Sequence, residues 1–189
     1  MKIIWAPWRI KYISQSKKKR NCFICEIIKD FNDEENLVLY RGKNTIVLMN
    51  KYPYNSAHIM ISPIRHITNF YELKEYEFEE IFKLIAKSQK IIENLYKPDG
   101  FNLGVNIGKA AGAGEDHLHF HILPRWFGDT NFMTIFSETR VIPESLFDIY
   151  KKLKEAFIEN NSWFSHPLKI FKSNKQGYGN TPNIKMGKN

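Results

Sequence analysis

Three histidines that alternate with apolar residues constrain this chain more than any other stretch of its sequence. The stretch is His117-Leu118-His119-Phe120-His121-Ile122, between a glycine-containing loop and Leu123-Pro124. Side chains alternate between the two faces of a β-strand, so the histidines are expected on one face and the apolar residues in a core on the other. A row of three imidazoles does not fill a core, and we interpret the stretch as a functional site.

Four interpretations of these histidines remain open from the residues alone. They are ordinary sheet residues, a three-histidine zinc site, general acid–base groups, or a nucleophile that attacks phosphorus beside a phosphate-binding glycine loop. Strand residues rise about 3.3 Å each, which puts the backbones of the outer two histidines roughly 13 Å apart. This span argues against three ligands on one zinc ion, because Zn–N bonds are only about 2 Å long.

Length and composition indicate one globular domain, with 189 residues of which 43% are hydrophobic and 14% aromatic. No apolar run approaches the ~18 residues of a membrane span, and no secretory signal is evident, so we expect a cytoplasmic protein. The net charge of +8 comes from residues 17–20 and from the segment after residue 160; without those nine cations, 19 basic residues face 20 acidic ones. A nearly neutral body argues against a nucleic-acid partner.

The order of expected elements indicates an α+β fold with a five-stranded antiparallel sheet and two helices. Residues 37–40 and 45–49 predict a hairpin, 57–61 a third strand closed by Pro63, 101–107 a fourth, and the histidine stretch the fifth. Apolar residues at three- and four-residue steps predict a helix over 72–96, with lysines and glutamates on its opposite face. A second helix is expected over 143–157, and residues 21–29 are expected to begin a short one.

Domain boundaries follow from shifts in composition. Residues 1–20 contain two tryptophans and are expected to form an N-terminal arm that packs on the body or on a second subunit. Residues 21–157 are expected to form the folded domain. Residues 158–189 are rich in Asn, Lys, Gly and Ser and are expected to form a basic, partly ordered tail.

The histidine stretch resembles the His-φ-His-φ-His-φ-φ signature of the histidine triad (HIT) superfamily of nucleotide hydrolases and transferases. Asn50, the segment 55–63, the long helix and the glycine loop follow in the family's order. The opening Trp5-Ala6-Pro7-Trp8-Arg9 and residues 124–132 are similar to the branch that acts on dinucleoside polyphosphates such as diadenosine tetraphosphate (Ap4A). The resemblance implies a HIT-like fold and a homodimer whose two sheets join into one.

The resemblance also implies a role for each site residue. His119 would attack an α-phosphate and form a nucleotidyl-histidine, His121 would bind phosphate and help protonate the leaving group, and His58 would lie behind His121. Nucleotide contacts would come from a ribose ligand and from a phosphate-binding stretch, which are Asn50, Asn106, Gly112, Ala113 and Gly114. Ala113 stands where fragile-histidine-triad enzymes carry a glutamine, so backbone N–H groups would have to hold the polyphosphate. Phosphorylase branches often carry a glutamine in or after the triad, and its absence here favours water as the acceptor.

Cys22 and Cys25 are the two cysteines, spaced C-x-x-C. By themselves they are compatible with a metal site, a redox pair or reduced thiols without a metal. Several bacterial HIT proteins hold a structural zinc between such a pair and two histidines, which implies Cys22, Cys25, His66 and His117 as ligands here. Two thiolates and two imidazoles make a closed tetrahedral site, which is structural rather than catalytic.

Two other functions fit the same resemblance. A nucleoside phosphoramidase is one, although that branch usually carries aspartate where this chain has Asn50. The other is a nucleotide-binding signalling module without turnover, whose basic tail docks an acidic partner. Intact His58, His119 and His121 argue against pure binding.

Overall fold

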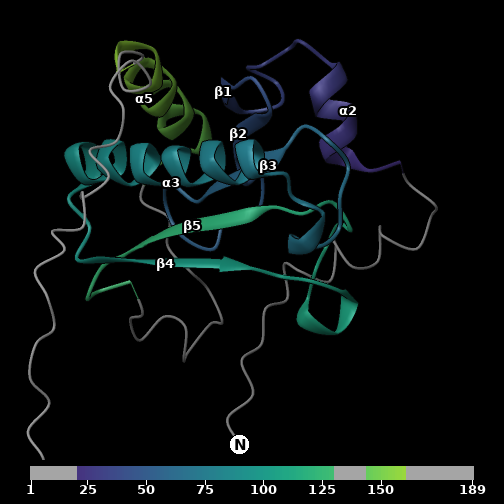
Figure 1. Cartoon of the computed structure of the whole chain (residues 1–189). Coiled ribbons are helices and arrows are strands. Elements are labelled where there is room, and N and C mark those ends of the chain that lie inside the picture. The colour runs from purple at the N-terminus through teal and green to yellow at the C-terminus, as the bar shows by residue number, and fades with distance from the viewer. Residues whose placement is uncertain (1–20, 130–143, 161–189) are drawn as a thin grey trace, which may run out of the picture.

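The computed structural model of the chain describes residues 21–129 and 144–160, which form an α+β fold (Figure 1). The N-terminal arm and nearly all of the expected tail therefore lie outside the described residues. The elements in chain order are α2 (Phe23–Lys29), β1 (Val38–Arg41), β2 (Thr45–Met49), β3 (Ile59–Pro63), the 3-10 turn η1 (Phe70–Glu72), α3 (Glu75–Tyr96), β4 (Gly100–Val105), the 3-10 turn η2 (Lys109–Ala111), β5 (Phe120–Arg125) and α5 (Leu146–Glu159). The expected hairpin, long helix and short first helix are confirmed.

The five strands form one antiparallel sheet in the order β1-β2-β3-β5-β4. The last strand in sequence is therefore inserted between β3 and β4, and β4 is an edge strand. In the β3–β5 pairing Met60 lies opposite His121, and in the β4–β5 pairing Gly104 lies opposite the same histidine. The sheet order thus brings the triad stretch beside the segment that carries His58.

Both faces of the central strands are covered. On one face α3 and α5 pack on Val47, Met49, Ile59 and Ile61, with Leu118, Phe120 and Ile122 in the same core. On the other face the apolar residues of α2 pack on a second, smaller cluster, made of Val38, Ile46, Leu48 and Met60. Since alternate residues of β2 join opposite clusters, all five of its residues are buried. His121 alternates with core residues and lies on the α2 face of the sheet.

The triad stretch is less regular than expected, because β5 begins at Phe120, after His117 and His119. The preceding residues bond to the segment after β3 instead of to a regular ladder. The Leu118 N–H donates to the Ile67 carbonyl at 2.7 Å, and the Ser62 hydroxyl donates to the Leu118 carbonyl at 2.8 Å. The alternation itself holds, since Leu118, Phe120 and Ile122 are buried in the core.

Other boundaries also differ from expectation. The third strand runs Ile59–Pro63 and therefore includes Pro63. It begins two residues later than expected, because Ala57 takes a left-handed conformation at φ 55° and ends the preceding turn. The fourth strand ends at Val105, and α3 begins at Glu75 after η1. The second predicted helix begins at Leu146, where the Ser145 hydroxyl accepts the Asp148 N–H at 3.1 Å as an N-cap. Pro143 lies outside the described residues.

The prediction that charged residues of α3 lie on an exposed face is wrong for Glu77 and Lys87. Glu77 and Lys87 are buried, while Phe78 and Phe82 are exposed. The Lys87 ammonium donates to the Phe157 carbonyl at 3.2 Å and lies over the rings of Tyr40 and Phe157, so it joins α3 to α5. Among the described residues, no helix is long and apolar enough to cross a membrane.

Candidate active site

A cavity of about 640 Å³ opens between α2, the β2–β3 side of the sheet and the loop before the triad stretch. Six of the residues expected to bind or react with a nucleotide line it: Asn50, Asn106, Gly112, Gly114, His119 and His121. Ala113 and His58 do not line this cavity. Its apolar wall, which pattern reasoning missed, includes Phe23 and Ile27 of α2 with Leu48 and Met60 of the sheet.

His58 contacts His121 and does not itself line the cavity. Its Nδ1 accepts the backbone N–H of Tyr54 at 3.2 Å, so the proton of the neutral ring is on Nε2. The His58 Nε2–H then donates to His121 Nδ1 at 2.9 Å. His121 must therefore carry its own proton on Nε2, the nitrogen on the far side of its ring. Burial, with His121 and His119 nearby, lowers the pKa of His58 to about 3, which keeps this ring neutral.

His119 is oriented by a backbone carbonyl two residues earlier in the chain. Its Nδ1 lies 2.6 Å from the His117 carbonyl oxygen, and only an N–H can bond there. The lone pair is consequently on Nε2. Burial lowers the pKa of His119, which also favours the neutral ring. The rings of His119 and His121 meet edge to face with centroids 4.8 Å apart. One nucleophilic nitrogen and one N–H donor thus lie side by side at the cavity.

The loop before the triad stretch is closed by its own hydrogen bonds. Gly108 and Gly112 have positive φ angles of 78° and 83°, which glycine adopts readily. The N–H groups of Gly112 and Ala113 donate to the carbonyls of Lys109 and Gly108 at 3.0 and 3.3 Å. Use of these two groups by a phosphate requires those bonds to open. Asn106 and Gly114 also line the cavity.

Asn50, which also lines the cavity, is held by two hydrogen bonds of its turn. Its side-chain oxygen accepts the Tyr52 N–H at 2.9 Å, and its backbone N–H donates to the His58 carbonyl at 2.9 Å. The Asn50 amide is therefore held by the same turn that orients His58. Carboxylates also line the cavity, among them Glu115, whose pKa is raised by burial and by Asp116.

Four possible metal ligands gather at the other end of the triad stretch. One ligand atom each from Cys22, Cys25, His66 and His117 lies within 4.8 Å of the others. The Sγ–Nδ1 distances are 3.4 Å for Cys22–His117, 3.5 Å for Cys25–His117 and 3.2 Å for Cys25–His66. Tetrahedral zinc with bonds of about 2.3 Å to sulfur and 2.0 Å to nitrogen separates such atoms by about 3.5 Å. The donor set and its spacing therefore fit zinc.

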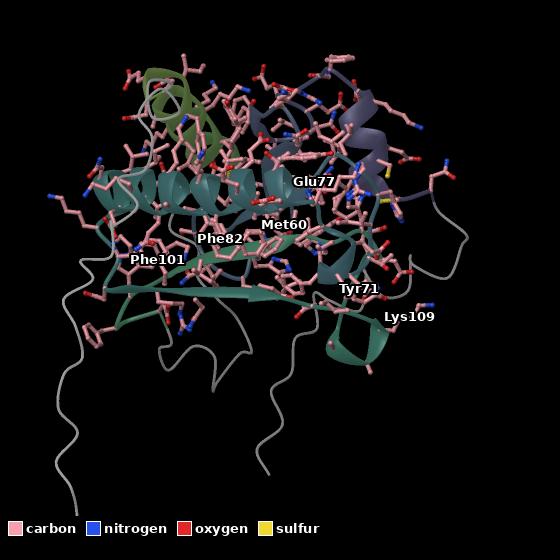
Figure 2. The ribbon with its side chains drawn as sticks, in the orientation of Figure 1. Met60, Tyr71, Glu77, Phe82, Phe101 and Lys109 are labelled. Carbon is pink, nitrogen blue, oxygen red and sulfur yellow. The ribbon has the colours of Figure 1, made fainter. Side chains whose placement is uncertain are left out.

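The surroundings of His117 support the same geometry. Its Nε2 lies 2.9 Å from the Pro63 carbonyl, which places the proton there and leaves Nδ1 as the ligand atom. Arg65, next to His66, makes a bidentate pair with the buried Glu77 at 2.8 and 2.7 Å. Glu77 lies near the N-terminal end of α3 (Figure 2), where it also accepts the Lys74 N–H at 2.9 Å. Sequence reasoning missed this pair, although a glutamate three residues after a helix cap is a known signal.

Comparison with known proteins decides the family. The family model of the HIT domain matches residues 32–128. The AP-4-A phosphorylase of Mycobacterium tuberculosis is 37% identical over 158 residues, which cover 79% of this chain and 81% of that protein. The chain belongs to the HIT family. The predicted family and its antiparallel α+β fold are thereby confirmed, and the chain is a HIT-family enzyme.

Two further proteins extend the comparison. The bis(5'-adenosyl)-triphosphatase of Saccharomyces cerevisiae is 34% identical over 90 residues, 47% of this chain and 44% of that protein. A Zn-bound histidine triad family protein from Mycobacterium smegmatis has the same fold, with a TM-score of 0.61 and 22% identity over 75% of this chain and 96% of that one.

Proposed function

We propose that this HIT protein cleaves dinucleoside polyphosphates such as Ap4A at an α-phosphate, through a nucleotidyl-histidine formed on His119. The observation that carries the proposal is the bond from His119 Nδ1–H to the His117 carbonyl, which aims the Nε2 lone pair while His121 stands beside it. The similarity to an AP-4-A phosphorylase and a bis(5'-adenosyl)-triphosphatase supports the substrate class.

The proposed first step joins His119 to the α-phosphorus. The lone pair of His119 Nε2 attacks the α-phosphorus, and the bond to the bridging oxygen breaks, releasing a nucleoside polyphosphate with its electron pair. His119 becomes a phosphorylated imidazolium whose Nδ1–H faces the His117 carbonyl, an acceptor suited to the new positive charge. His121, with its proton on Nε2, donates to the phosphate or leaving oxygen as charge develops there.

In the proposed second step an acceptor attacks the same phosphorus and restores neutral His119. Water yields a nucleoside monophosphate, and inorganic phosphate yields a nucleoside diphosphate. The similarity to the AP-4-A phosphorylase extends over most of both chains, which favours inorganic phosphate as the acceptor. We give this similarity more weight than the missing glutamine, which favours water.

Binding is proposed to follow the cavity. Asn50 would contact the ribose hydroxyls, since an amide can both donate and accept. The base would lie against the apolar wall of Phe23, Ile27, Leu48 and Met60. The polyphosphate would reach Asn106 and the loop that contains Gly112, Ala113 and Gly114.

We further propose that Cys22, Cys25, His66 and His117 hold one structural zinc ion per chain. Bound zinc would fix the tautomer and position of His117, and so the carbonyl that orients His119. Thiolate ligation of this kind suits a reducing compartment and supports a cytoplasmic location.

A homodimer is proposed on the face formed by α3 and the edge strand β4. Phe78 and Phe82 are each about half exposed and pack together with ring centroids 4.4 Å apart, and Phe82 reaches Phe120 of β5. Phe82 is labelled on α3 in Figure 2. Exposed aromatic patches beside an unpaired strand edge are typical of subunit interfaces.

The test uses purified full-length chain with Ap4A, with and without inorganic phosphate, and identifies the nucleotide products. The wild type is expected to release ADP and ATP with phosphate, or AMP and ATP with water. His119→Asn should lose at least about 10⁴-fold in kcat, as loss of a nucleophile does, while AMP affinity is retained. Near-normal cleavage by His119→Asn contradicts the nucleophile. Hydrolysis of adenosine phosphoramidate but not of Ap4A would indicate the phosphoramidase instead, and turnover of neither substrate would indicate a binding module.

A further inference from the structure

Asn55 joins the turn before β3 to the chain that follows β5. Its side-chain amide donates to Asp129 Oδ2 at 2.9 Å and to the Pro124 carbonyl at 3.2 Å. Asp129 is held firmly, because Arg125 donates to both of its oxygens at 2.6 and 2.9 Å and the Trp126 N–H donates at 3.2 Å. Its side chain is only 7% exposed. We call the Asn55–Asp129 bond the clasp; neither residue lines the cavity.

The turn that the clasp holds is strained. Ala57 is fully buried and takes a left-handed conformation at φ 55°. Such a conformation costs a residue with a Cβ about 1–2 kcal/mol, so the turn relies on bonds to the rest of the fold. The clasp makes such bonds, two residues before Ala57 and one residue after Tyr54.

Tyr54 transmits the position of this turn to the histidines. Its backbone N–H donates to His58 Nδ1 at 3.2 Å, and its ring stacks on His58 with centroids 5.2 Å apart. This N–H forces the His58 proton onto Nε2, which in turn forces the His121 proton onto Nε2. If the Tyr54 N–H moved away, His58 could carry its proton on Nδ1. Its Nε2 would then accept from His121 Nδ1–H, and His121 Nε2 would present a lone pair instead of a donor.

We propose that Asn55 and Asp129 are positioning residues that set the tautomer of His121 through the Tyr54 N–H and His58. The proposal rests on the function proposed above, because a donor on His121 Nε2 matters only if phosphate charge develops there. The clasp acts from outside the nucleotide cavity. Its loss should therefore reduce the chemical step more than nucleotide binding.

The experiment compares Asn55→Ala with a matched control, Asn102→Ala. Asn102 accepts the Arg125 Nη1–H at 2.7 Å, so the control removes a bond from the same cluster without touching the turn before β3. Long-range ¹H–¹⁵N spectra of the ¹⁵N-labelled full-length chains report the tautomer of each histidine. Steady-state kinetics with Ap4A and AMP titrations report kcat, KM and affinity.

Wild type and Asn102→Ala are expected to show His58 and His121 protonated on Nε2. Asn55→Ala should show Nδ1–H character at both rings and a kcat lower by 10- to 100-fold, the range that small misplacements of a reacting group produce. Its AMP affinity should fall by a smaller factor than kcat, although Asn50 and Tyr54 of the same turn line the cavity. Wild-type tautomers and kcat in Asn55→Ala would overturn the proposal, as would a loss explained wholly by weaker AMP binding.

A second variant covers the case in which Asn55→Ala does not fold. Asp129→Asn keeps an oxygen facing Asn55 but removes the charge that Arg125 holds, and it should shift the same tautomers in part. Wild-type tautomers in this variant would overturn the proposal when Asn55→Ala cannot be measured. The tautomer readout needs no substrate, so a wild type with Nε2–H histidines but no Ap4A cleavage would contradict the proposed function and not the clasp.

Discussion

The Nδ1 of His119 lies 2.6 Å from the carbonyl oxygen of His117, two residues earlier in the chain. His117 also belongs to the four-residue metal cluster, through Nδ1, while its Nε2 bonds to the Pro63 carbonyl. His117 therefore offers its side chain to the metal cluster and its carbonyl to the proposed nucleophile, His119. The candidate metal cluster and the proposed nucleophile are therefore joined through the backbone of residues 117–119.

Metal binding should control nucleotide affinity. Cys22 precedes α2 and Cys25 lies within it, and the same helix contributes Phe23 and Ile27 to the cavity wall. We expect one zinc per wild-type chain and little in Cys22→Ser, measured by elemental analysis. AMP affinity in Cys22→Ser should fall on the order of tenfold, a common size for coupling between sites, and by reciprocity AMP should strengthen zinc retention against a chelator.

The control for this prediction is Lys29→Ser, an exposed change in the last turn of α2 that touches none of the four ligands. It should keep both zinc and AMP affinity. Equal AMP affinity in wild type, Cys22→Ser and chelated protein would show that the metal site and the cavity are independent.

The buried carboxylate of Glu77 should be far more important for stability than a surface one on the same helix. Glu77 is 2% exposed and pairs with Arg65, whereas Glu79 is 63% exposed and pairs with Lys83. Glu77→Gln should lower the free energy of unfolding by about 2–3 kcal/mol, because the buried side chain loses its charge-assisted hydrogen bonds to Arg65. Glu79→Gln should change it by less than about 0.5 kcal/mol. Urea unfolding of both variants measures the difference, and similar losses would contradict it.

His58 should make stability depend on pH. Its pKa in the folded chain is about 3, against 6.5 in the unfolded chain. Between these values the unfolded chain binds the proton and the folded chain does not, so stability from this group is complete above about pH 6.5 and falls as the pH decreases. From pH 7.5 to 5.0 the loss should be about 2 kcal/mol, since each unit below 6.5 contributes about 1.4 kcal/mol. The groups that face the His58 ring include His121, His119 and the Tyr54 N–H.

Urea unfolding at both pH values, in wild type and His58→Gln, measures this contribution. Glutamine keeps hydrogen-bonding groups at the position but does not titrate, so the variant should lose less stability on acidification. The prediction fails if the two proteins lose the same amount. The interval from pH 7.5 to 5.0 lies above the ordinary pKa values of Asp and Glu, so protonation of carboxylates contributes little to the loss of stability.

Self-association should depend on the aromatic face of α3. Phe82→Lys puts a charge into the patch that Phe82 forms with Phe78 and Phe120, and it should raise the dimer dissociation constant about 30-fold, as loss of a central aromatic residue does. Ile158→Lys on α5 makes the same change at an exposed apolar residue away from that patch. Sedimentation of both variants checks the result. A monomeric wild type, or equal effects of the two changes, contradicts the proposed interface.

The sequence by itself determined which residues of the triad stretch share a face, and where the long helix lies, although not every buried residue of that helix. The alternation around His119 predicted a buried strand with its histidines on the side away from the core, and the three- and four-residue steps predicted α3. These signals are local, since the periods of 2 and 3.6 residues depend on backbone geometry within one element. The C-x-x-C pair and the histidine pattern were also recognisable from the sequence as family motifs, because such motifs are defined by residue types and their spacing.

Only the tertiary structure decided what each side chain meets. His58 and His121 are 63 residues apart and bond because β5 inserts next to β3. Glu77 is buried because Arg65 lies opposite it, and Asn55 acts on the histidines only because Asp129 comes within 2.9 Å. Even the start of β5 depends on bonds to Ser62 and Ile67 from another segment. A local pattern specifies the face on which a side chain lies, but its protonation and its partners depend on groups that the fold brings from elsewhere in the chain.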